Sequence, residues 1–312
     1  MPEPRTLTVA PGGPPADMAP GAALAMALLS IAFGANAVAA RMAMPSFGPL
    51  TMAGLRFLIG AALVAVWARL QGEPLALGGR RLRDAVLFGV VFSVQLGLFY
   101  LGLQRTLASR GSLIGNLQPF LVLLLAHFLL RGERITLRRL LGMFLGFAGI
   151  LALFLDSQAT TSTVRGGDFI ILVAVVIWSG TTVWLKRIID DFTSFQIALY
   201  PMAVSAVLLL AAGAAWDDPM VGDVSGRALG ALGYQAVMAG VGFVAWNVMF
   251  RRYGAVAINS YLFLQPVAGV SLGALLLGEP IASHGILLGL PLVVVGIAIV
   301  NLRVEARKRA AS

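Results

Sequence analysis

Long, unbroken apolar runs follow one another along almost the whole chain. From Gly21 to about residue 302, stretches of helix length alternate with short interruptions rich in Arg, Asp, Gly and Pro. A transmembrane helix needs about 20 mainly apolar residues, whereas a membrane-barrel strand alternates apolar and polar residues over about ten. The pattern therefore predicts an all-α integral membrane protein.

The composition agrees with this assignment. With 59% hydrophobic and only 12% charged residues, the chain is far more apolar than a soluble domain, in which about a quarter of the residues are charged. The apolar runs predict ten transmembrane helices, and little sequence is left for a soluble domain. The expected spans are 22–41, 49–68, 85–104, 111–130, 140–155, 169–187, 194–215, 228–250, 257–277 and 282–302.

The chain outside the spans is expected to form only loops and tails. Six prolines and no apolar run in the first twenty residues favour a disordered tail over a signal peptide. The predicted organisation is a disordered cytoplasmic tail (1–20), a first five-helix repeat (21–156), a second, inverted five-helix repeat (157–303) and a basic cytoplasmic tail (304–312).

The net charge of +9 would suggest a nucleic-acid partner in a soluble protein. In membrane proteins, however, excess Lys and Arg gather on cytoplasmic loops. Ten spans with both ends of the chain on one side place most of the 23 Lys and Arg residues on that side. We therefore expect a multi-pass protein of the cytoplasmic (inner) membrane with both termini cytoplasmic, membrane lipid as a partner and no nucleic-acid partner.

The sequence shows no arrangement of residues that is typical of an enzyme active site. The chain contains no cysteine, its lysines Lys186 and Lys308 follow no phosphate-binding loop, and His127 and His284 lack zinc-ligand spacing. We expect neither catalysis nor a cofactor or metal.

The sequence also carries an internal duplication. The two halves align at a shift of 145 positions in the first two spans of each half and 147 positions further on. The superposed pairs include Phe33 on Trp178, Arg41 on Lys186, Phe47 on Phe192, Phe99 on Trp246, Arg105 on Arg252 and Gln118-Pro119 on Gln265-Pro266. Because each half holds five spans, the second half must insert upside down. Such inverted repeats can rock about a central site.

At these residues the chain resembles the EamA family of the drug/metabolite transporter superfamily. The resemblance rests on Asn116-Leu117-Gln118-Pro119 running to Gly132-Glu133, on Leu264-Gln265-Pro266 running to Gly278-Glu279, and on Arg56-Phe57-Leu58. It implies a ten-helix inner-membrane carrier, often an exporter of amino acids or other small metabolites, with a cavity between the halves. It identifies no substrate, because the superfamily also contains nucleotide-sugar and triose-phosphate carriers.

Arg56 is the one clear ionisable residue inside a predicted span, and its repeat mate is Pro201. Charged groups in a bilayer are costly and are candidates for function by default. Its guanidinium could bind a carboxylate or phosphate of the substrate. Snorkelling to the outer surface, or pairing with carbonyls of a neighbouring helix, would be a structural alternative.

Uncharged polar and aromatic residues within the spans are the other candidates for a substrate site. They are Asn36, Gln95, Tyr100, Asn116, Trp178, Gln235, Trp246 and Asn247. Such groups can hydrogen-bond or stack on a solute in a wet cavity, and Trp178 is too deep for an interfacial belt. They can equally tie helices together.

Two further pairs of residues are candidates for hinges and gates. Pro119 and Pro266 interrupt the hydrogen bonding of two repeat-related helices and would act as hinges. Glu133 and Glu279 end helices on opposite sides and would act as gates, or would simply be acids at the headgroup boundary.

Taken together, the sequence predicts a secondary transporter, an exporter of small metabolites working by alternating access. A lipid flippase and a non-transporting scaffold or sensor are the alternatives. No Asp or Glu lies at mid-span, so proton coupling has no obvious carrier. A small-molecule substrate is expected, and a homodimer is compatible with the sequence.

Overall fold

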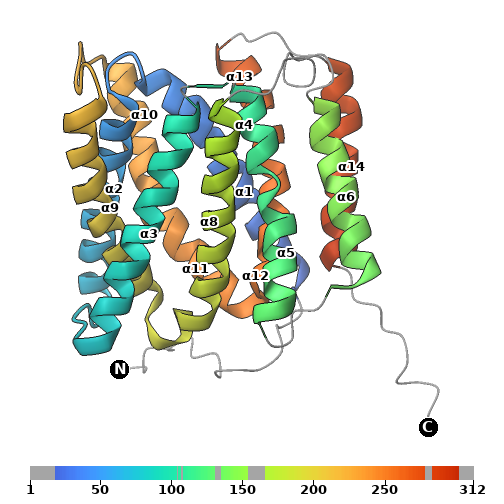
Figure 1. Cartoon of the computed structure of the whole chain (residues 1–312), viewed down its shortest axis with the longest axis horizontal. Helices are drawn as coiled ribbons and strands as arrows, with labels where there is room; N and C mark the ends of the chain where they lie inside the picture. The colour runs from blue at the N-terminus through green and yellow to red at the C-terminus, as the bar shows by residue number, and fades with distance from the viewer. Residues whose placement is uncertain are drawn as a thin grey trace.

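The computed structural model describes residues 18–103, 105–106, 108–130, 135–153, 166–277 and 283–301. Over these residues the secondary structure is helical, apart from one isolated β-bridge between Phe47 and Val221. The helices run side by side as a bundle (Figure 1). This confirms the all-α prediction.

Within the described residues, the helices group into ten crossings, and seven of them are long and apolar enough by themselves to span a membrane. The first five crossings are α1 (Pro20–Ala43), α2 (Pro49–Leu70), α3 (Gly79–Leu103), α4 (Ala108–Gly115) with α5 (Gln118–Leu129), and α6 (Leu137–Leu153). The second five are α8 (Gly166–Ile188) with η1 (Ile189–Asp191), α9 (Ser194–Trp216), α10 (Gly226–Val237) with the π-helical η2 (Met238–Gly242) and α11 (Phe243–Tyr253), α12 (Ala255–Ser260) with η3 (Tyr261–Phe263) and α13 (Leu264–Leu277), and α14 (Ser283–Asn301).

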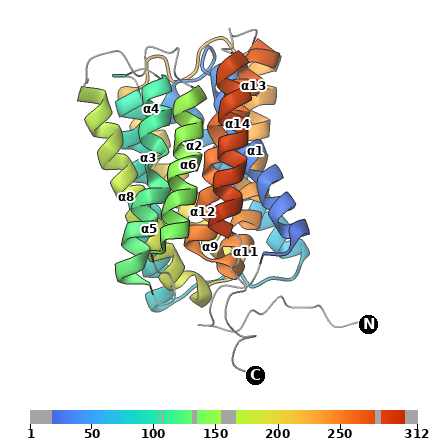
Figure 2. The same cartoon turned by 90° about the vertical axis from the view of Figure 1, so that its right-hand side faces the viewer.

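The start of α1 and the end of α14 lie on the same face of the bundle (Figures 1 and 2). The connections from α2 to α3, from α8 to α9 and from α11 to α12 lie there as well. We call this the basic face, and the other the opposite face. The described basic residues near it are Arg69, Arg80, Arg81, Arg83, Arg138, Arg139, Lys186, Arg187, Arg251 and Arg252.

Eight crossings form a closed ring of packed neighbours. Its order is α1, α10–α11, α2, α9, α3, α8, α4–α5 and α12–α13, which returns to α1. Exchanging each crossing for its repeat mate maps this ring onto itself: the α1–α10 contact becomes α8–α3, and the α2–α10 contact becomes α9–α3. The contacts therefore follow the pseudo-two-fold symmetry of two inverted five-helix repeats.

The two remaining crossings, α6 and α14, pack against each other beside the ring (Figures 1 and 2). Glycines allow their backbones to meet. A Cβ on Gly149 would lie 2.6 Å from the carbonyl oxygen of Gly289, and one on Gly142 would lie 2.7 Å from that of Gly296. Since Gly149 is the repeat mate of Gly296 and Gly142 that of Gly289, the symmetry exchanges these contacts. The glycines serve internal helix packing.

Candidate functional site

Polar side chains of α3 and α8 meet near the middle of the bundle. The Thr181 hydroxyl donates to Gln95 Oε1 at 2.6 Å, and both side chains are buried. Thr181 also lies within hydrogen-bond distance of the Trp178 carbonyl oxygen, at 2.8 Å. Because burying an unpaired polar group in lipid is costly, this pairing stabilises the buried Oε1 of Gln95.

Gln118 joins three crossings at one point. Its Nε2 donates to Thr182 Oγ1 of α8 at 3.2 Å and to Asn259 Oδ1 of α12 at 3.0 Å. Gln118 is fully buried, and its Oε1 has no hydrogen-bond partner within the described ranges. In the sequence, Gln118 stands out only as part of the repeat signature. The same doubled Gln-Pro pair could have marked it as a site residue.

Arg56 lies seven residues after the start of α2, about 10 Å into the helix. Its Nη1 donates to Gln235 Oε1 of α10 at 3.4 Å, and its guanidinium carbon lies 4.8 Å from the centre of the Phe57 ring. Gln235 is fully buried, while Arg56 is half-buried with a Nε that lacks a partner. No ion pair of Arg56 is found in the part of the chain that the structure describes. The geometry leaves donor capacity for an anionic group.

Aromatic candidates lie in different parts of the ring. Trp246 packs edge-on against Phe33 of α1, with ring centroids 5.8 Å apart, and Tyr100 packs edge-on against Phe99 at 6.4 Å. Trp178 is half-buried at the middle of α8. Since α1 packs against α10 and α13 while α8 packs against α3 and α5, Phe33 and its repeat mate Trp178 lie on separate arcs of the ring.

The three asparagines predicted for the substrate site differ in their surroundings. Asn36 on α1 is half-buried, and its Oδ1 has no hydrogen-bond partner among the residues described. Asn116 is buried in the turn between α4 and α5, and Asn247 is buried on α11. The structure therefore distributes the asparagines over three crossings and does not join them in one cluster.

Both predicted hinge prolines follow a break in a helix. Pro119 is in the first turn of α5, directly after the turn at Asn116 and Leu117 that ends α4. Pro266 is in the first turn of α13, directly after the 3-10 segment η3. A proline has no N–H to continue the ladder, which accounts for both breaks. Glu133 and Glu279, the predicted gate residues, lie outside the described residues.

A third irregularity has no proline. The π-helical segment η2 interrupts the crossing formed by α10 and α11, between Gln235 and Trp246. Its Gly240 meets Gly60 of α2, and a Cβ on Gly240 would lie 3.1 Å from the Gly60 carbonyl oxygen. Such bulges are frequent at functional sites. Gln235 and the pair Trp246–Asn247 are thus carried by separate helical segments.

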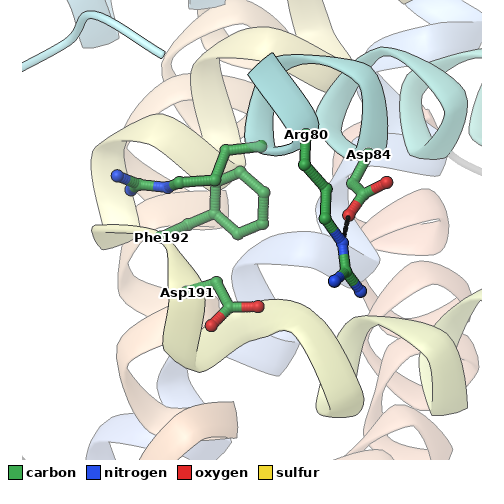
Figure 3. A pocket seen from close by; sticks show the side chains of 5 residues that line it. Arg80, Asp84, Asp191 and Phe192 are labelled. Atoms are coloured by element: carbon green, nitrogen blue, oxygen red, sulfur yellow. Dashed lines mark ion pairs between the residues drawn. The ribbon is translucent and has the colours of Figure 1, made fainter. Parts of the chain in front are cut away.

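A pocket of about 350 Å³ lies at the basic face and not among these polar residues. It is lined by Arg80, Arg81, Asp84, Asp191 and Phe192, and Figure 3 shows Arg80 paired with Asp84 beside Phe192. The Arg80 Nε and Asp84 Oδ2 atoms are 3.4 Å apart, but the Arg80 side chain is 85% exposed. An exposed pair of this kind contributes little binding energy.

Comparison with known proteins identifies the architecture. The model of the EamA-like transporter family matches residues 20–155 and 165–302, one match to each half. A solved crystal structure, 21% identical in sequence, superposes with a TM-score of 0.76 over 90% of this chain and 96% of that one. At this identity the superposition establishes the fold alone.

Several relatives by sequence are named as transporters. The chain is 26% identical to the uncharacterized transporter YyaM of Bacillus subtilis (strain 168) over 275 residues, which is 86% of this chain and 89% of the relative. It is also 26% identical to a probable amino-acid metabolite efflux pump of Escherichia coli (strain K12), over 81% of this chain and 85% of the relative.

Proposed function

The chain belongs to the EamA-like transporter family, and from that premise we propose that it exports small polar metabolites such as amino acids by alternating access. It is a multi-pass membrane transporter with a small-molecule substrate, and it is not an enzyme. The proposal adds the class of solute, the direction and the mechanism to what the family gives.

One observation carries the alternating-access part of the proposal. Each ring contact joins one repeat to the other and recurs as its mate when the two repeats are exchanged, and polar side chains of both repeats pair across these contacts. A carrier built in this way can exchange the conformations of its two halves, which turns a site that faces one side into a site that faces the other. A packed scaffold without transport activity has no need of this equivalence.

The solute class rests on the chemistry of the site and on the name of a relative. Arg56 is assigned to the carboxylate of the solute because its Nε has no partner among the described residues and Gln235 occupies its Nη1 only at 3.4 Å. Hydrogen bonds to the rest of the solute are assigned to Asn36, Gln95, Asn116, Gln235 and Asn247, and ring contacts to Tyr100, Trp178 and Trp246. The amino-acid metabolite efflux pump of Escherichia coli supports the same class.

The orientation follows from charge. Lys and Arg resist translocation, so the basic face is assigned to the cytoplasm, with both termini on that side of the inner membrane. Pro119 and Pro266 are the hinges in this proposal, because each lies where a helix restarts after a break. Whether a proton gradient drives the export is left to the experiment.

The test is transport by purified protein in liposomes, offered radiolabelled amino acids and nucleosides with and without a pH gradient. Amino-acid flux is expected. Flux of nucleosides alone would contradict the amino-acid assignment. Flux that does not depend on the pH gradient would show that transport is not coupled to protons. Transbilayer movement of labelled lipid without solute flux would instead identify a flippase.

Two variants test the predicted site residues, and a third controls for general damage to the fold. We expect Gln95→Ala and Trp178→Ala to lower uptake about tenfold, the loss that follows from one or two missing polar or ring contacts. The matched control is Phe169→Ala on α8, the helix that also carries Trp178, since the Phe169 side chain is 67% exposed. Unchanged kinetics in both site variants would refute the site assignment.

A further inference from the structure

Arg251, at the end of α11, makes several polar contacts at the basic face. Its Nη2 donates to the carbonyl oxygens of Ile189 at 2.7 Å and Phe192 at 2.6 Å, and its Nε lies 3.7 Å from Asp190 Oδ1. In return, the Lys186 ammonium group donates to the Arg251 carbonyl oxygen at 3.1 Å. The Arg251 side chain is only 18% exposed. We call these contacts the basic-face latch.

The latch connects the end of α11 to the connection between α8 and α9. In the ring order, the α10–α11 crossing is a neighbour of neither α8 nor α9. The crossing that α11 completes starts as α10 between α1 and α2, but at the basic face α11 packs against α9 and η1. Charge-assisted hydrogen bonds from a guanidinium to the carbonyls at a helix end are favourable both as hydrogen bonds and with the helix dipole. The basic end of α11 is thereby fixed over the α8–α9 corner.

Two of the three latch residues have uncharged repeat mates. Arg251 corresponds to Gln104 and Asp190 to Pro45, while Lys186 corresponds to Arg41. The end of α3, which is the mate of the end of α11, packs against the start of α8: a Cβ on Gly102 would lie 3.0 Å from the Gly167 carbonyl oxygen. The ends of α11 and α3, which are repeat mates, are therefore held by different contacts.

From this asymmetry we propose that Arg251 is a positioning residue for transport, which holds the basic face closed and must release the α8–α9 corner each time that face opens. The inference rests on the proposed alternating access. In the conformation in which the two repeats exchange their arrangements, the end of α11 takes the place that the end of α3 has here. It then leaves the α8–α9 corner and packs against the start of α1, as α3 now packs against the start of α8. Breaking the latch thus favours the state open to the basic face.

The cysteine-free chain allows a direct measurement. Cysteines introduced at Asp191 and Arg252, both exposed, carry spin labels on either side of the latch, and their separation is measured by pulsed electron paramagnetic resonance in lipid nanodiscs without added solute. The test variant is Arg251→Gln, which installs the residue of the opposite face. The control is Arg83→Gln, an exposed arginine of the same face that pairs with Asp84.

We expect one short distance in the doubly labelled parent and in the control. Arg251→Gln should add a longer distance and shift the ratio of open to closed molecules by about tenfold, because two charge-assisted hydrogen bonds are lost. If that variant does not fold, Lys186→Gln, which removes the reciprocal bond and leaves the Arg251 guanidinium in place, should give a smaller shift in the same direction. Distances unchanged in every folded latch variant would overturn the proposal.

Transport by the parent in liposomes keeps this test separate from the proposed function. A distance shift in Arg251→Gln together with no flux of any offered solute in the parent would support the latch and contradict the solute assignment. Solute flux in the parent with no shift in Arg251→Gln or Lys186→Gln would contradict the latch and leave the transporter assignment standing.

Discussion

The first turns of α2 and α9 are repeat mates, yet they are capped in different ways. The N-terminus of α9 carries its own capping box, in which Thr193 and Gln196 exchange side-chain and backbone hydrogen bonds. The N-terminus of α2 has no capping side chain of its own. Instead, Asp217 at the end of α9 accepts from the backbone N–H groups of Thr51 at 2.6 Å and Leu50 at 3.4 Å.

A second pair of equivalent contacts shows the same divergence. Gly60 of α2 meets Gly240 of η2 by close backbone approach, while their repeat mates Ser205 of α9 and Ser93 of α3 share a hydrogen bond of 2.8 Å. Backbone geometry is thus retained between the halves, while the chemistry that satisfies it has changed. Symmetry in this protein belongs to helix packing, and function can draw on the differences.

The largest expected effect tests the retained symmetry. Gly149→Leu and its mate Gly296→Leu should each destabilise the protein by about 3 kcal/mol or more, since a Cβ at either position would meet a backbone oxygen within 2.6 Å. Thermal unfolding in detergent measures this. Gly233→Leu is the control, because a Cβ there meets nothing within 4 Å. A large loss in one mate with none in the other would break the equivalence of the α6–α14 contacts.

The second prediction concerns the caps. Asp217→Ala should cost about 1 to 2 kcal/mol because two N–H groups at the positive end of α2 lose a charged acceptor. Thr193→Ala should cost about 1 kcal/mol because it removes one local acceptor of α9. The two midpoints of unfolding, measured under one condition, give the comparison. An Asp217→Ala variant as stable as the parent would show that the Asp217 carboxylate of α9 does not stabilise the N-terminus of α2.

The smallest expected effect concerns the serine pair. Ser205→Ala should cost about 0.6 kcal/mol, the average for a hydrogen bond between membrane helices. Ser93 also donates to the Gly89 carbonyl oxygen at 2.6 Å, so it keeps a partner when Ser205 is lost. A double-mutant cycle with Ser93→Ala isolates the coupling. Additive losses in that cycle would indicate that the two serines act independently.

Most of the fold was predictable because lipid imposes a simple rule on length and polarity. The expected span 194–215 became Ser194–Trp216, and 49–68 became Pro49–Leu70. The third span was expected to start at residue 85, but α3 starts at Gly79. Its first turns carry Arg80, Arg83 and Asp84, which form a polar helix outside the apolar run and so escape a hydropathy criterion.

The polar contacts were less predictable than the spans. The repeat alignment and the prolines indicated where α4 and α12 break, but nothing in the sequence marks the π-helical η2. In the sequence, Arg251 is an ordinary basic residue at the end of an apolar span. Its acceptors are backbone carbonyls about 60 residues away, at Ile189 and Phe192, and a carbonyl has no sequence signature.

The candidate site shows the same limit. Arg56 and Gln235 could each be chosen as polar residues within a span, but their contact joins helices far apart in the sequence. Gln95 is hydrogen-bonded to Thr181, and Gln118 to Thr182 and Asn259. Each of these bonds joins a residue of the first repeat to a residue of the second. Pairing of this kind depends on register and tilt, which single-sequence patterns do not specify.

The most direct test of alternating access is two-sided labelling of a single cysteine at Asn36, the half-buried asparagine of α1. Sealed proteoliposomes of known orientation receive a membrane-impermeant maleimide on one side only, in separate experiments for each side. We predict that Asn36→Cys reacts from both sides, and faster from the basic side when Arg251→Gln is also present. Reaction from one side alone, however long the exposure, would contradict a carrier that turns its centre to each side in turn.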